Sequence, residues 1–302
     1  MAPNWLIGTE QGSGDTGRLP AMPEFETSDG TMLWYEERGP GDAPPVVLLH
    51  GFTSSHRMWH AQRAELEGRY RFVVPDLRGH GLSGAPEDLG TYSIERYAAD
   101  ARELLDHLEI GICALIGCSF GGMIALQFAV TWPERLACLV VSDASPAYEH
   151  VSYDERFRER EEAIRANEAF AAERGMAGLG KRLAANVHDA FLADGIRRRY
   201  AAMALPGYLG AAKTRRERPD VTSLLRERLT MPVLLCDGDA DPVFSALDVM
   251  ARELPEARVA IFEGAAHGLP SQRPEAFTVV LREFLEDVEA GAGVTGRRVI
   301  AM

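Results

Sequence analysis

The sequence has few cysteines and no long apolar run, and each shortage argues against a class of protein. The cysteines form no C-x-x-C pair and lie in or beside apolar runs, which argues against a disulfide framework and against a cysteine metal site. No stretch approaches the ~20 apolar residues of a membrane span, and the first twenty residues lack the basic start and apolar core of a signal peptide. We therefore expect a cytoplasmic protein with no membrane partner and with four reduced thiols, at Cys113, Cys118, Cys138 and Cys236.

Lysine is also scarce, occurring only at Lys181 and Lys213, so arginine supplies nearly all of the positive charge. We interpret this as compositional bias. The net charge of -13 argues against a nucleic-acid partner, because phosphates would repel the chain. A length of 302 residues with 46% hydrophobic residues suits one large globular domain, or one domain with an insertion. Residues 1–22 are predicted to be a flexible extension and residues 291–302 a loose tail.

The most informative segment is Gly117-Cys118-Ser119-Phe120-Gly121, which follows an apolar run and precedes a helical one. A G-x-S-x-G between a strand and a helix is typical of a nucleophile elbow, a strained turn that presents a serine hydroxyl above a sheet. The turn requires small neighbours, and the glycines supply them. The following helix points its N-terminus toward the serine, where the dipole favours developing negative charge. Ser119 is therefore the predicted nucleophile.

Apolar runs alternate with helical patterns along most of the chain, which predicts a doubly wound α/β sheet. The last six runs are nearly all apolar rather than alternating, as expected for parallel strands that are covered on both faces. In such sheets ligands bind beyond the carboxyl ends of the strands. The predicted strands are a hairpin at 25–27 and 32–35, then 46–49, 71–74, 114–116, 139–141, 233–236 and 259–262. The predicted helices are 93–108, 121–131, 246–254 and 274–288.

A long stretch between Val141 and Val233 has no convincing strand. Residues 153–174 are rich in Arg, Glu and Ala, and residues 180–200 are similar. We interpret residues 148–228 as a helical cap over the site, called the cap segment below, and residues 23–147 and 229–290 as the core. Residues Phe191 and Tyr208 are expected to line or pack the cap.

A catalytic serine needs a base, and the base needs an orienting acid. Asp241 follows the strand that ends at Cys236, and His267 follows the last predicted strand, so both can reach the face that carries Ser119. An oxyanion hole would be formed by the backbone N–H groups of Phe52, after the strand at 46–49, and of Phe120.

These motifs resemble the α/β-hydrolase superfamily over about residues 25–288. Within it the chain is similar to the enol-lactonase, carboxylesterase and non-haem-haloperoxidase-like group. The resemblance implies the chain order Ser, Asp, His for the triad and a mostly parallel eight-stranded sheet with helices on both faces. A serine at the elbow disfavours epoxide hydrolases and haloalkane dehalogenases, which use aspartate there. The matching segments are His50-Gly51-Phe52, residues 76–83, the elbow, Asp241-Pro242-Val243 and residues 264–267.

Several residues have competing interpretations. Asp237 and Asp239 are rivals of Asp241, although both suit turn chemistry or helix capping. Asp143 is another rival, because some members of this fold place the acid after the sixth strand. Cys118 is expected to be a small buried side chain and not a second nucleophile. Two further residues, His50 and His80, are expected to brace loops.

The arginines of residues 154–165 suit a solvated helix face, with a carboxylate-binding role for one of them as the alternative. The predicted function is a serine hydrolase that cleaves a small-molecule ester or lactone through an acyl-enzyme, with no cofactor and no metal. The alternatives are a non-hydrolytic or carbon–carbon bond cleaving enzyme with the same triad and, third, a ligand-binding protein on this scaffold. A homodimer stays open.

Overall fold

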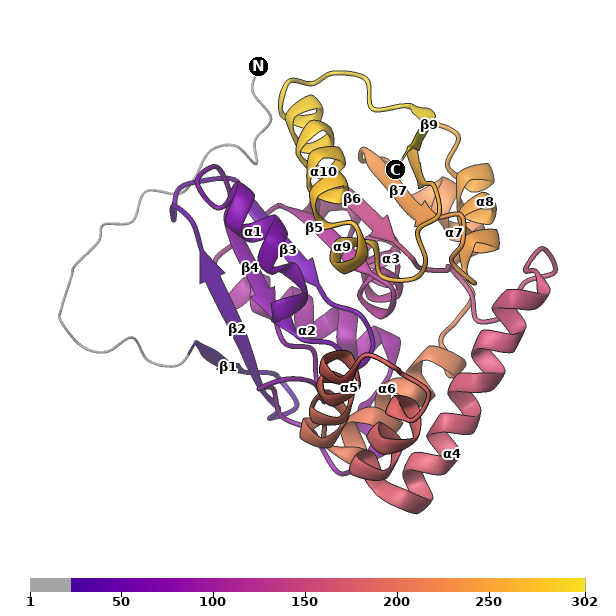
Figure 1. Ribbon diagram of the computed structural model, residues 1–302. Coiled ribbons are helices and arrows are strands. Elements are labelled where there is room, and N and C mark those ends of the chain that lie inside the picture. The colour runs from indigo at the N-terminus through magenta and orange to yellow at the C-terminus, as the bar shows by residue number, and fades with distance from the viewer. Residues whose placement is uncertain (1–22, 302) are drawn as a thin grey trace.

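The computed structural model describes residues 23–301, so the extension predicted over residues 1–22 lies outside the described residues. The described chain is built on one nine-stranded sheet in the order β1-β2-β4-β3-β5-β6-β7-β8-β9 (Figure 1). β1 and β2 form an antiparallel hairpin, β2 pairs antiparallel with β4, and all later neighbours are parallel. The strands are β1 (Glu24–Glu26), β2 (Met32–Arg38), β3 (Pro45–Leu49), β4 (Arg71–Pro75), β5 (Cys113–Cys118), β6 (Leu136–Ser142), β7 (Val233–Gly238), β8 (Arg258–Phe262) and β9 (Gly296–Ile300).

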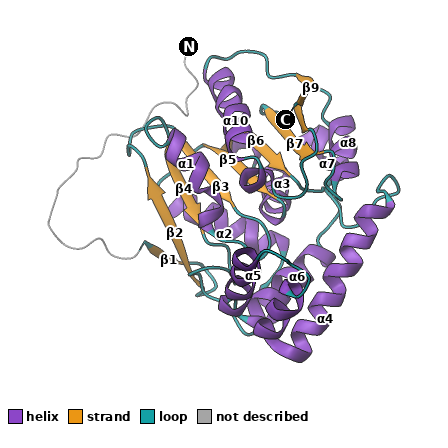
Figure 2. Cartoon of the chain, in the orientation of Figure 1, coloured by secondary structure: helices purple, strands orange, loops and turns teal. Residues whose placement is uncertain are grey.

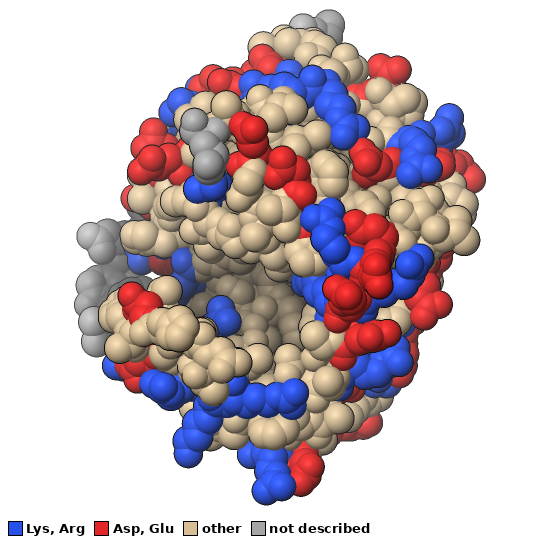
Figure 3. Space-filling model, turned by 45° about the vertical axis from the view of Figure 1, so that its right-hand side comes forward, with Lys and Arg blue, Asp and Glu red and all other residues tan. Residues whose placement is uncertain are grey.

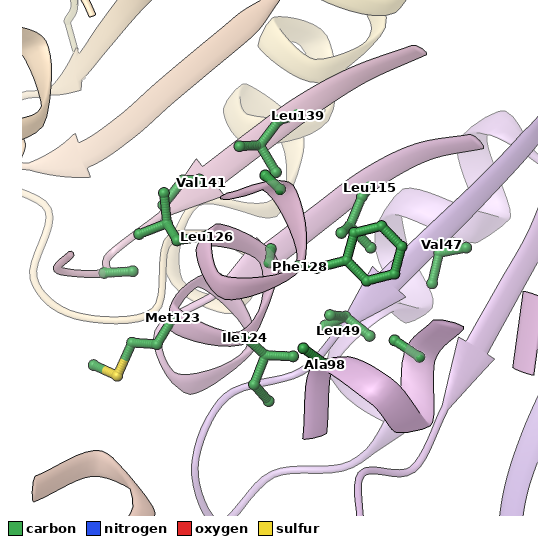
Figure 4. Packing of buried hydrophobic residues seen from close by; sticks show 14 of the residues in the cluster. Val47, Leu49, Ala98, Leu115, Met123, Ile124, Leu126, Phe128, Leu139 and Val141 are labelled. Atoms are coloured by element: carbon green, nitrogen blue, oxygen red, sulfur yellow. The ribbon is translucent and has the colours of Figure 1, made fainter. Parts of the chain in front are cut away.

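Helices cover both faces of the central strands, as their uninterrupted apolar runs predict. Along β3, Val47 and Leu49 face one apolar cluster while Val46 and Leu48 face the other, because successive side chains point to opposite faces. The first cluster includes α2, α3 and α8, and Figure 4 shows Leu126 and Phe128 packed below the strands. The second includes α10. The helices of the core are α1 (His60–Leu66), α2 (Ile94–His107), α3 (Phe120–Thr131), α8 (Phe244–Glu253), α9 (Leu269–Gln272) and α10 (Pro274–Glu289), with 3-10 turns at His56–Trp59, Leu89–Thr91 and Pro133–Arg135.

The strand register brings the loops after β3, β5, β6, β7 and β8 together at the carboxyl ends of the strands, which are called the sheet edge below. Leu49 is paired with Gly117, and Cys118 is paired with Ser142, which in turn is paired with Cys236. On the far side of β7, Gly238 is paired with Phe262. The residues that follow each of these pairs therefore lie side by side. This alignment is what brings segments distant in the sequence to one site.

The cap segment contains four helices and no strand within the part of the chain that the structure describes (Figure 2). They are α4 (Glu155–Ala184), α5 (Ala190–Ala202), α6 (Leu205–Glu217) and α7 (Thr222–Arg228). Asp154 begins α4 by accepting a hydrogen bond from the N–H of Phe157. α4 is interrupted at Gly175, whose φ of 70° is a left-handed backbone conformation that glycine adopts without strain. Within the described residues, no helix is both long and apolar enough to cross a membrane.

The two ends of the cap segment are held together where the chain leaves and re-enters the sheet. The buried guanidinium of Arg218, at the end of α6, donates hydrogen bonds to Ser145 Oγ at 2.7 Å and to the carbonyl of Ala147. The N–H of Val221 donates to the carbonyl of Pro146 at 3.2 Å. All three acceptors lie in the loop after β6. The cap segment is therefore closed at its base by side-chain and backbone hydrogen bonds.

The C-terminal segment differs from the prediction of a loose tail. Residues Gly296–Ile300 form β9, which pairs parallel with β8 from Arg258 to Phe262 and adds a ninth strand to the predicted eight. The strand is at the edge of the sheet and mostly exposed, so it lacks the continuous apolar pattern by which the other parallel strands were identified. The strand is held in addition by ion pairs, of exposed Arg297 with Asp248 at 3.0 Å and of half-buried Arg298 with Glu283 at 2.7 Å.

Candidate active site

The turn between β5 and α3 has the backbone strain of a nucleophile elbow. Ser119 has φ 55° and ψ -115°, a conformation that side chains rarely adopt, and its N–H donates to the carbonyl of Ser142 at 2.8 Å. A Cβ atom at Gly117 would overlap the carbonyl of Gly121, and one at Gly121 would overlap the carbonyl of Leu49. Only glycine therefore fits on both sides of the serine. The glycines of the predicted elbow motif are therefore required by the close packing of β5, α3 and β3.

The side chains of the predicted triad meet at this turn. The Nε2 atom of His267 lies 2.8 Å from Ser119 Oγ, and its Nδ1 atom lies 2.7 Å from Asp241 Oδ2. The other oxygen of Asp241 accepts a hydrogen bond from the N–H of Val243 at 2.9 Å. Asp241 and Ser119 are buried, whereas the imidazole is 28% exposed. The ring is thus held between a buried carboxylate and a serine hydroxyl.

Asp241 is kept ionised by its surroundings. Burial raises the pKa of Asp241, but the hydrogen bonds from His267 and from the N–H of Val243 act against burial, and that pKa lies below its ordinary value. The neighbouring Asp237 is also buried, and burial together with the charge of Asp241 raises the pKa of Asp237 well above its ordinary value. Asp237 Oδ1 accepts from the N–H of Gly238, whereas its Oδ2 has no hydrogen-bond partner among the described residues. The imidazole is therefore bonded to Asp241 and not to its rival Asp237.

Asp143, the rival after β6, holds the backbone of the histidine loop and not the ring. Its Oδ1 accepts from the N–H of Gly268 at 2.8 Å, and both oxygens lie within hydrogen-bonding distance of the N–H of Leu269. Burial raises the pKa of Asp143 to about 6. Gly268 has φ 96°, which accounts for glycine at this position of the loop. The last rival, Asp239, accepts from the N–H of Gly264 at 2.7 Å and braces the same loop from the other side.

The predicted oxyanion loop lies against the elbow. A Cβ atom at Gly51 would be 3.4 Å from Ser119 Cβ, so the backbone before Phe52 passes directly beside the serine. The N–H of Phe120 is at the first position of α3, where no preceding helical carbonyl can accept it. Buried His50 fixes the loop, since its Nδ1 donates to the carbonyl of Gly51 at 2.8 Å and its Nε2 accepts from the N–H of Leu77 at 3.0 Å.

His80 and Cys118 have the structural surroundings that the sequence predicted. His80 is buried among aromatic rings, with its Nδ1 donating to the carbonyl of Arg78 at 2.9 Å. Burial lowers the pKa of His80 to about 3. Burial and the charge of Asp143 raise the pKa of the Cys118 thiol well above its ordinary value, so the thiolate does not form at neutral pH. The elbow thus presents the serine and conceals the cysteine.

Among the described residues, one group has the ligand types of a metal site: Asp143, Asp241 and His267, with ligand atoms within 4.8 Å of one another. Their atoms are already engaged. The two nitrogens of His267 serve Asp241 and Ser119, and Asp143 accepts from Gly268, Leu269 and the Ser142 hydroxyl. This set therefore suits hydrogen bonding within the protein better than coordination of a cation.

The cap segment adds residues that the sequence did not single out. From α4, Arg160 Nη2 lies 2.9 Å from His267 Nε2, and Glu161 and Arg215 lie beside it. Figure 3 shows a hollow in one face of the molecule with Lys or Arg side chains inside it and along its rim. The sequence signal was present in the arginines of residues 154–165, whose alternative interpretation was a carboxylate-binding role. Helical periodicity alone does not select Arg160, because its direction depends on how α4 packs against the core.

Two aromatic residues of the cap segment have opposite surroundings. Tyr208 is buried and stacks on Phe52 with ring centroids 5.1 Å apart. Phe191 is 87% exposed, so the prediction that it lines or packs the cap is wrong. It lies in the first turn of α5, where only Ala193 is buried and the helix presents most of its residues to solvent. The apolar boundary of the site is therefore formed by α6 rather than by the start of α5.

Comparisons with known proteins show which family the chain is similar to. The model of the alpha/beta hydrolase fold family matches residues 44–274. A non-heme chloroperoxidase of Streptomyces lividans is 31% identical over 88% of this chain and 100% of its own length. The 3-oxoadipate enol-lactonase 2 of Acinetobacter baylyi is 26% identical over 85% of this chain and 96% of its own. The solved structure of a thermophilic esterase from Thermogutta terrifontis covers 89% of this chain and 98% of its own, with 29% identity and a TM-score of 0.74.

Proposed function

The chain belongs to the α/β-hydrolase fold family, and we propose that it is a serine hydrolase of carboxylic esters or lactones. The observation that carries the proposal is the His267 ring, whose Nε2 and Nδ1 atoms lie 2.8 Å from Ser119 Oγ and 2.7 Å from Asp241 Oδ2. The similarity to an enol-lactonase and to an esterase supports an acyl substrate. The substrate is a small molecule that enters between the sheet edge and the cap segment.

In the first half of the reaction, Ser119 attacks the substrate carbonyl while Nε2 of His267 accepts the hydroxyl proton. Asp241 stabilises the resulting imidazolium, because its carboxylate is buried, ionised and bonded to Nδ1. The N–H groups of Phe52 and Phe120 would donate to the oxyanion, a contribution of about 3–4 kcal/mol per donor in a serine protease. The imidazolium then protonates the leaving alcohol, which breaks the ester bond and leaves Ser119 acylated.

In the second half, a water molecule takes the place of the alcohol. Nε2 of His267 accepts a proton from this water as its oxygen attacks the acyl carbonyl, and the same proton then returns to Ser119 Oγ when the acid departs. For a lactone the alcohol and acid are parts of one product, so the ring opens without loss of a fragment. No step requires a cofactor.

The proposal is tested with a fluorophosphonate probe and p-nitrophenyl acetate. We expect the probe to label Ser119, p-nitrophenyl acetate to be hydrolysed, and both to be lost in Ser119→Ala. Labelling without turnover of any ester or lactone in a substrate screen would contradict hydrolysis. It would favour a non-hydrolytic reaction on the same triad, the alternative that the similarity to a chloroperoxidase suggests. Absence of labelling in the folded wild-type protein would favour a binding protein.

A further inference from the structure

A guanidinium group of the cap segment donates a hydrogen bond to the same nitrogen that the proposed mechanism uses as its base. Arg160 Nη2 lies 2.9 Å from His267 Nε2, while Ser119 Oγ lies 2.8 Å from that atom. A guanidinium can only donate hydrogen bonds, so Nε2 must act as an acceptor. The Nδ1 atom then carries the ring proton and donates it to Asp241. The imidazole is therefore neutral in this arrangement.

Neutral Nε2 has one lone pair, and two donors compete for it. Each hydrogen bond from Arg160 weakens the one from Ser119, and the positive charge beside Nε2 opposes the imidazolium that catalysis must form. Arg160 in this position is unfavourable to the proposed reaction. It becomes favourable only when something else accepts the guanidinium, so that Nε2 is left to Ser119.

The surroundings of Arg160 contain more positive than negative charge. Glu161 Oε1 accepts from Arg160 at 2.6 Å and from Arg215 at 2.7 Å, so one carboxylate serves two guanidinium groups. A third, Arg218, lies against Arg215 and donates to its carbonyl. The other carboxylate whose charge acts on Arg160 is that of Asp241, which is paired with His267. The three arginines thus share one carboxylate, that of Glu161.

Glu161 and Arg215 are buried and Arg160 is mostly buried, which makes the excess charge costly. The side chains of Arg160, Glu161 and Arg215 are 16%, 9% and 2% exposed. Nε of Arg215 has no hydrogen-bond acceptor among the described residues, and its guanidinium lies over the ring of Phe52 in the oxyanion loop, 5.5 Å from the ring centroid. Burial, followed by the charge of Arg215, lowers the pKa of Arg160 and lowers that of Arg218 to about 10. Buried charges of one sign are ordinarily balanced by a counter-ion.

A cavity of about 590 Å³ beside the oxyanion loop has the same excess of arginine. Its wall begins at Thr53, directly after Phe52, and continues along the end of α5. Three arginines and one buried aspartate, Asp76, contribute to the lining, and the arginines are Arg57, Arg198 and Arg199. Arg198 is paired with Asp194, so the wall keeps a small excess of positive charge, which favours anions beside the oxyanion loop in a protein of net charge -13.

We propose that Arg160 is the receptor for a carboxylate group carried by the substrate. This inference rests on the proposed function and adds the class of substrate: an ester or lactone with a free carboxylate. The carboxylate accepts from Arg160, supplies the missing negative charge and releases Nε2 for Ser119. Because Arg160 and Ser119 approach the same nitrogen, the carboxylate must lie only a few bonds from the reacting carbonyl. Neutral esters lack the group that withdraws Arg160.

The proposal is tested with two methyl esters of nearly equal shape, monomethyl succinate and methyl levulinate, in which a carboxylate and a methyl ketone occupy the same position. We expect wild type to have the higher kcat/KM for monomethyl succinate, measured by methanol release. In Arg160→Gln the ratio of the two kcat/KM values should fall about 10- to 100-fold, the range for a lost hydrogen bond between charged groups. Arg160→Lys should retain part of the preference, because it keeps the charge but not the planar fork.

The matched control is Arg158→Gln, an exposed arginine on the same helix, which should leave the ratio unchanged. Labelling of Ser119 by a small neutral fluorophosphonate shows which variants are folded. A wild-type enzyme that hydrolyses methyl levulinate as well as monomethyl succinate would overturn the proposal. So would an Arg160→Gln variant that is labelled normally and keeps the wild-type ratio.

A second measurement separates failure of this inference from failure of the proposed function. In Ser119→Ala, which cannot form an acyl-enzyme, calorimetry gives the affinity for monomethyl succinate without any turnover. We expect monomethyl succinate to bind more tightly than methyl levulinate. This difference in affinity should disappear in Ser119→Ala/Arg160→Gln. If wild type hydrolyses no ester but this difference is found, the hydrolase proposal fails and the carboxylate receptor stands. Equal binding of the two esters overturns the receptor.

Discussion

The sheet edge and the cap segment differ in how fully their charged side chains are paired. At the sheet edge, acidic and imidazole groups have matched partners: Asp241 has His267 and the N–H of Val243, and Asp143 has the N–H groups of the histidine loop. In the cap segment, Arg160 and Arg215 share one carboxylate and Arg215 Nε has no acceptor among the described residues. Asp241 and Asp143 therefore have their partners within the protein, whereas the guanidinium groups of the cap segment are suited to a charged ligand. We therefore propose that the sheet supplies the catalytic groups and that the cap segment selects the substrate.

The strongest test of this division removes the nucleophile from the matched region. We expect Ser119→Ala to lower ester hydrolysis by on the order of 10⁴- to 10⁶-fold, because the serine is the group that becomes acylated. The fold should persist, since only a hydroxyl is lost, and circular dichroism and thermal unfolding check it. Activity above a tenth of wild type would place the nucleophile elsewhere.

The next test compares two carboxylates of the sheet edge. Asp241→Asn should lower kcat on the order of a thousandfold or more, because an amide cannot stabilise the imidazolium and favours the wrong tautomer of His267. Asp143→Asn should cost less, since Asp143 contacts the backbone of the loop and not the ring. Both are measured as kcat with one activated ester. If Asp143→Asn proved the more damaging, the acid would belong at the end of β6.

A smaller effect is expected on the pH dependence of stability, through buried His80. The folded-state pKa of His80 is lowered to about 3 from its ordinary 6.5, so the unfolded chain takes up the proton first. The stability due to neutral His80 is therefore complete above pH 6.5 and is lost as the pH falls from 6.5 toward 3, by about 1.4 kcal/mol per pH unit. Protonated Nε2 would have no acceptor in its aromatic surroundings.

This prediction is measured as the free energy of unfolding in urea at several pH values. The difference between wild type and His80→Gln should shrink with acidification, whereas exposed His188→Gln in the cap segment should give a curve parallel to wild type. The comparison between variants is needed because Asp143, whose pKa is raised, gives an opposite slope of its own. Parallel curves for His80→Gln and wild type would mean that His80 titrates normally.

The smallest effect is expected from an apolar residue of the cap segment. Tyr208→Leu should change the relative kcat/KM values for short and long acyl chains several-fold, because one methylene in an apolar pocket is worth ~1–3 kcal/mol. Tyr208 stacks on Phe52, beside the proposed oxyanion hole. Phe191→Leu is the control, since exposed Phe191 should leave the preference unaltered.

The rate of Ser119 labelling by a small phosphonate should stay close to wild type in both of these variants. The division would break if His188→Ala, in the cap segment, prevented labelling in a folded protein. That result would make the cap segment part of the bond-breaking machinery and not only of substrate selection.

The sequence predicted the sheet edge far better than the cap segment, for a physical reason. Buried parallel strands such as 114–116 are continuous apolar runs, and the polar residues after them must lie at one edge, so Ser119, Asp241 and His267 could be identified from their places in the order. Arg160 follows no such rule, because the direction of a residue on a long polar helix depends on tertiary packing. The same limit applies to Phe191, which is exposed, and to the edge strand β9, which is mostly exposed and has no continuous apolar run to mark it.

The hydrogen bonds that close the base of the cap segment have a consequence for how the substrate preference of related proteins can change. Since Arg218 and Val221 return to Ser145, Pro146 and Ala147, the chain leaves and rejoins the sheet at one fixed point. The helices beyond that point can lengthen, shorten or be exchanged between relatives without moving the strands that hold the serine. A lineage can therefore acquire new substrates by rewriting one contiguous stretch of its gene while the residues that break bonds stay unaltered.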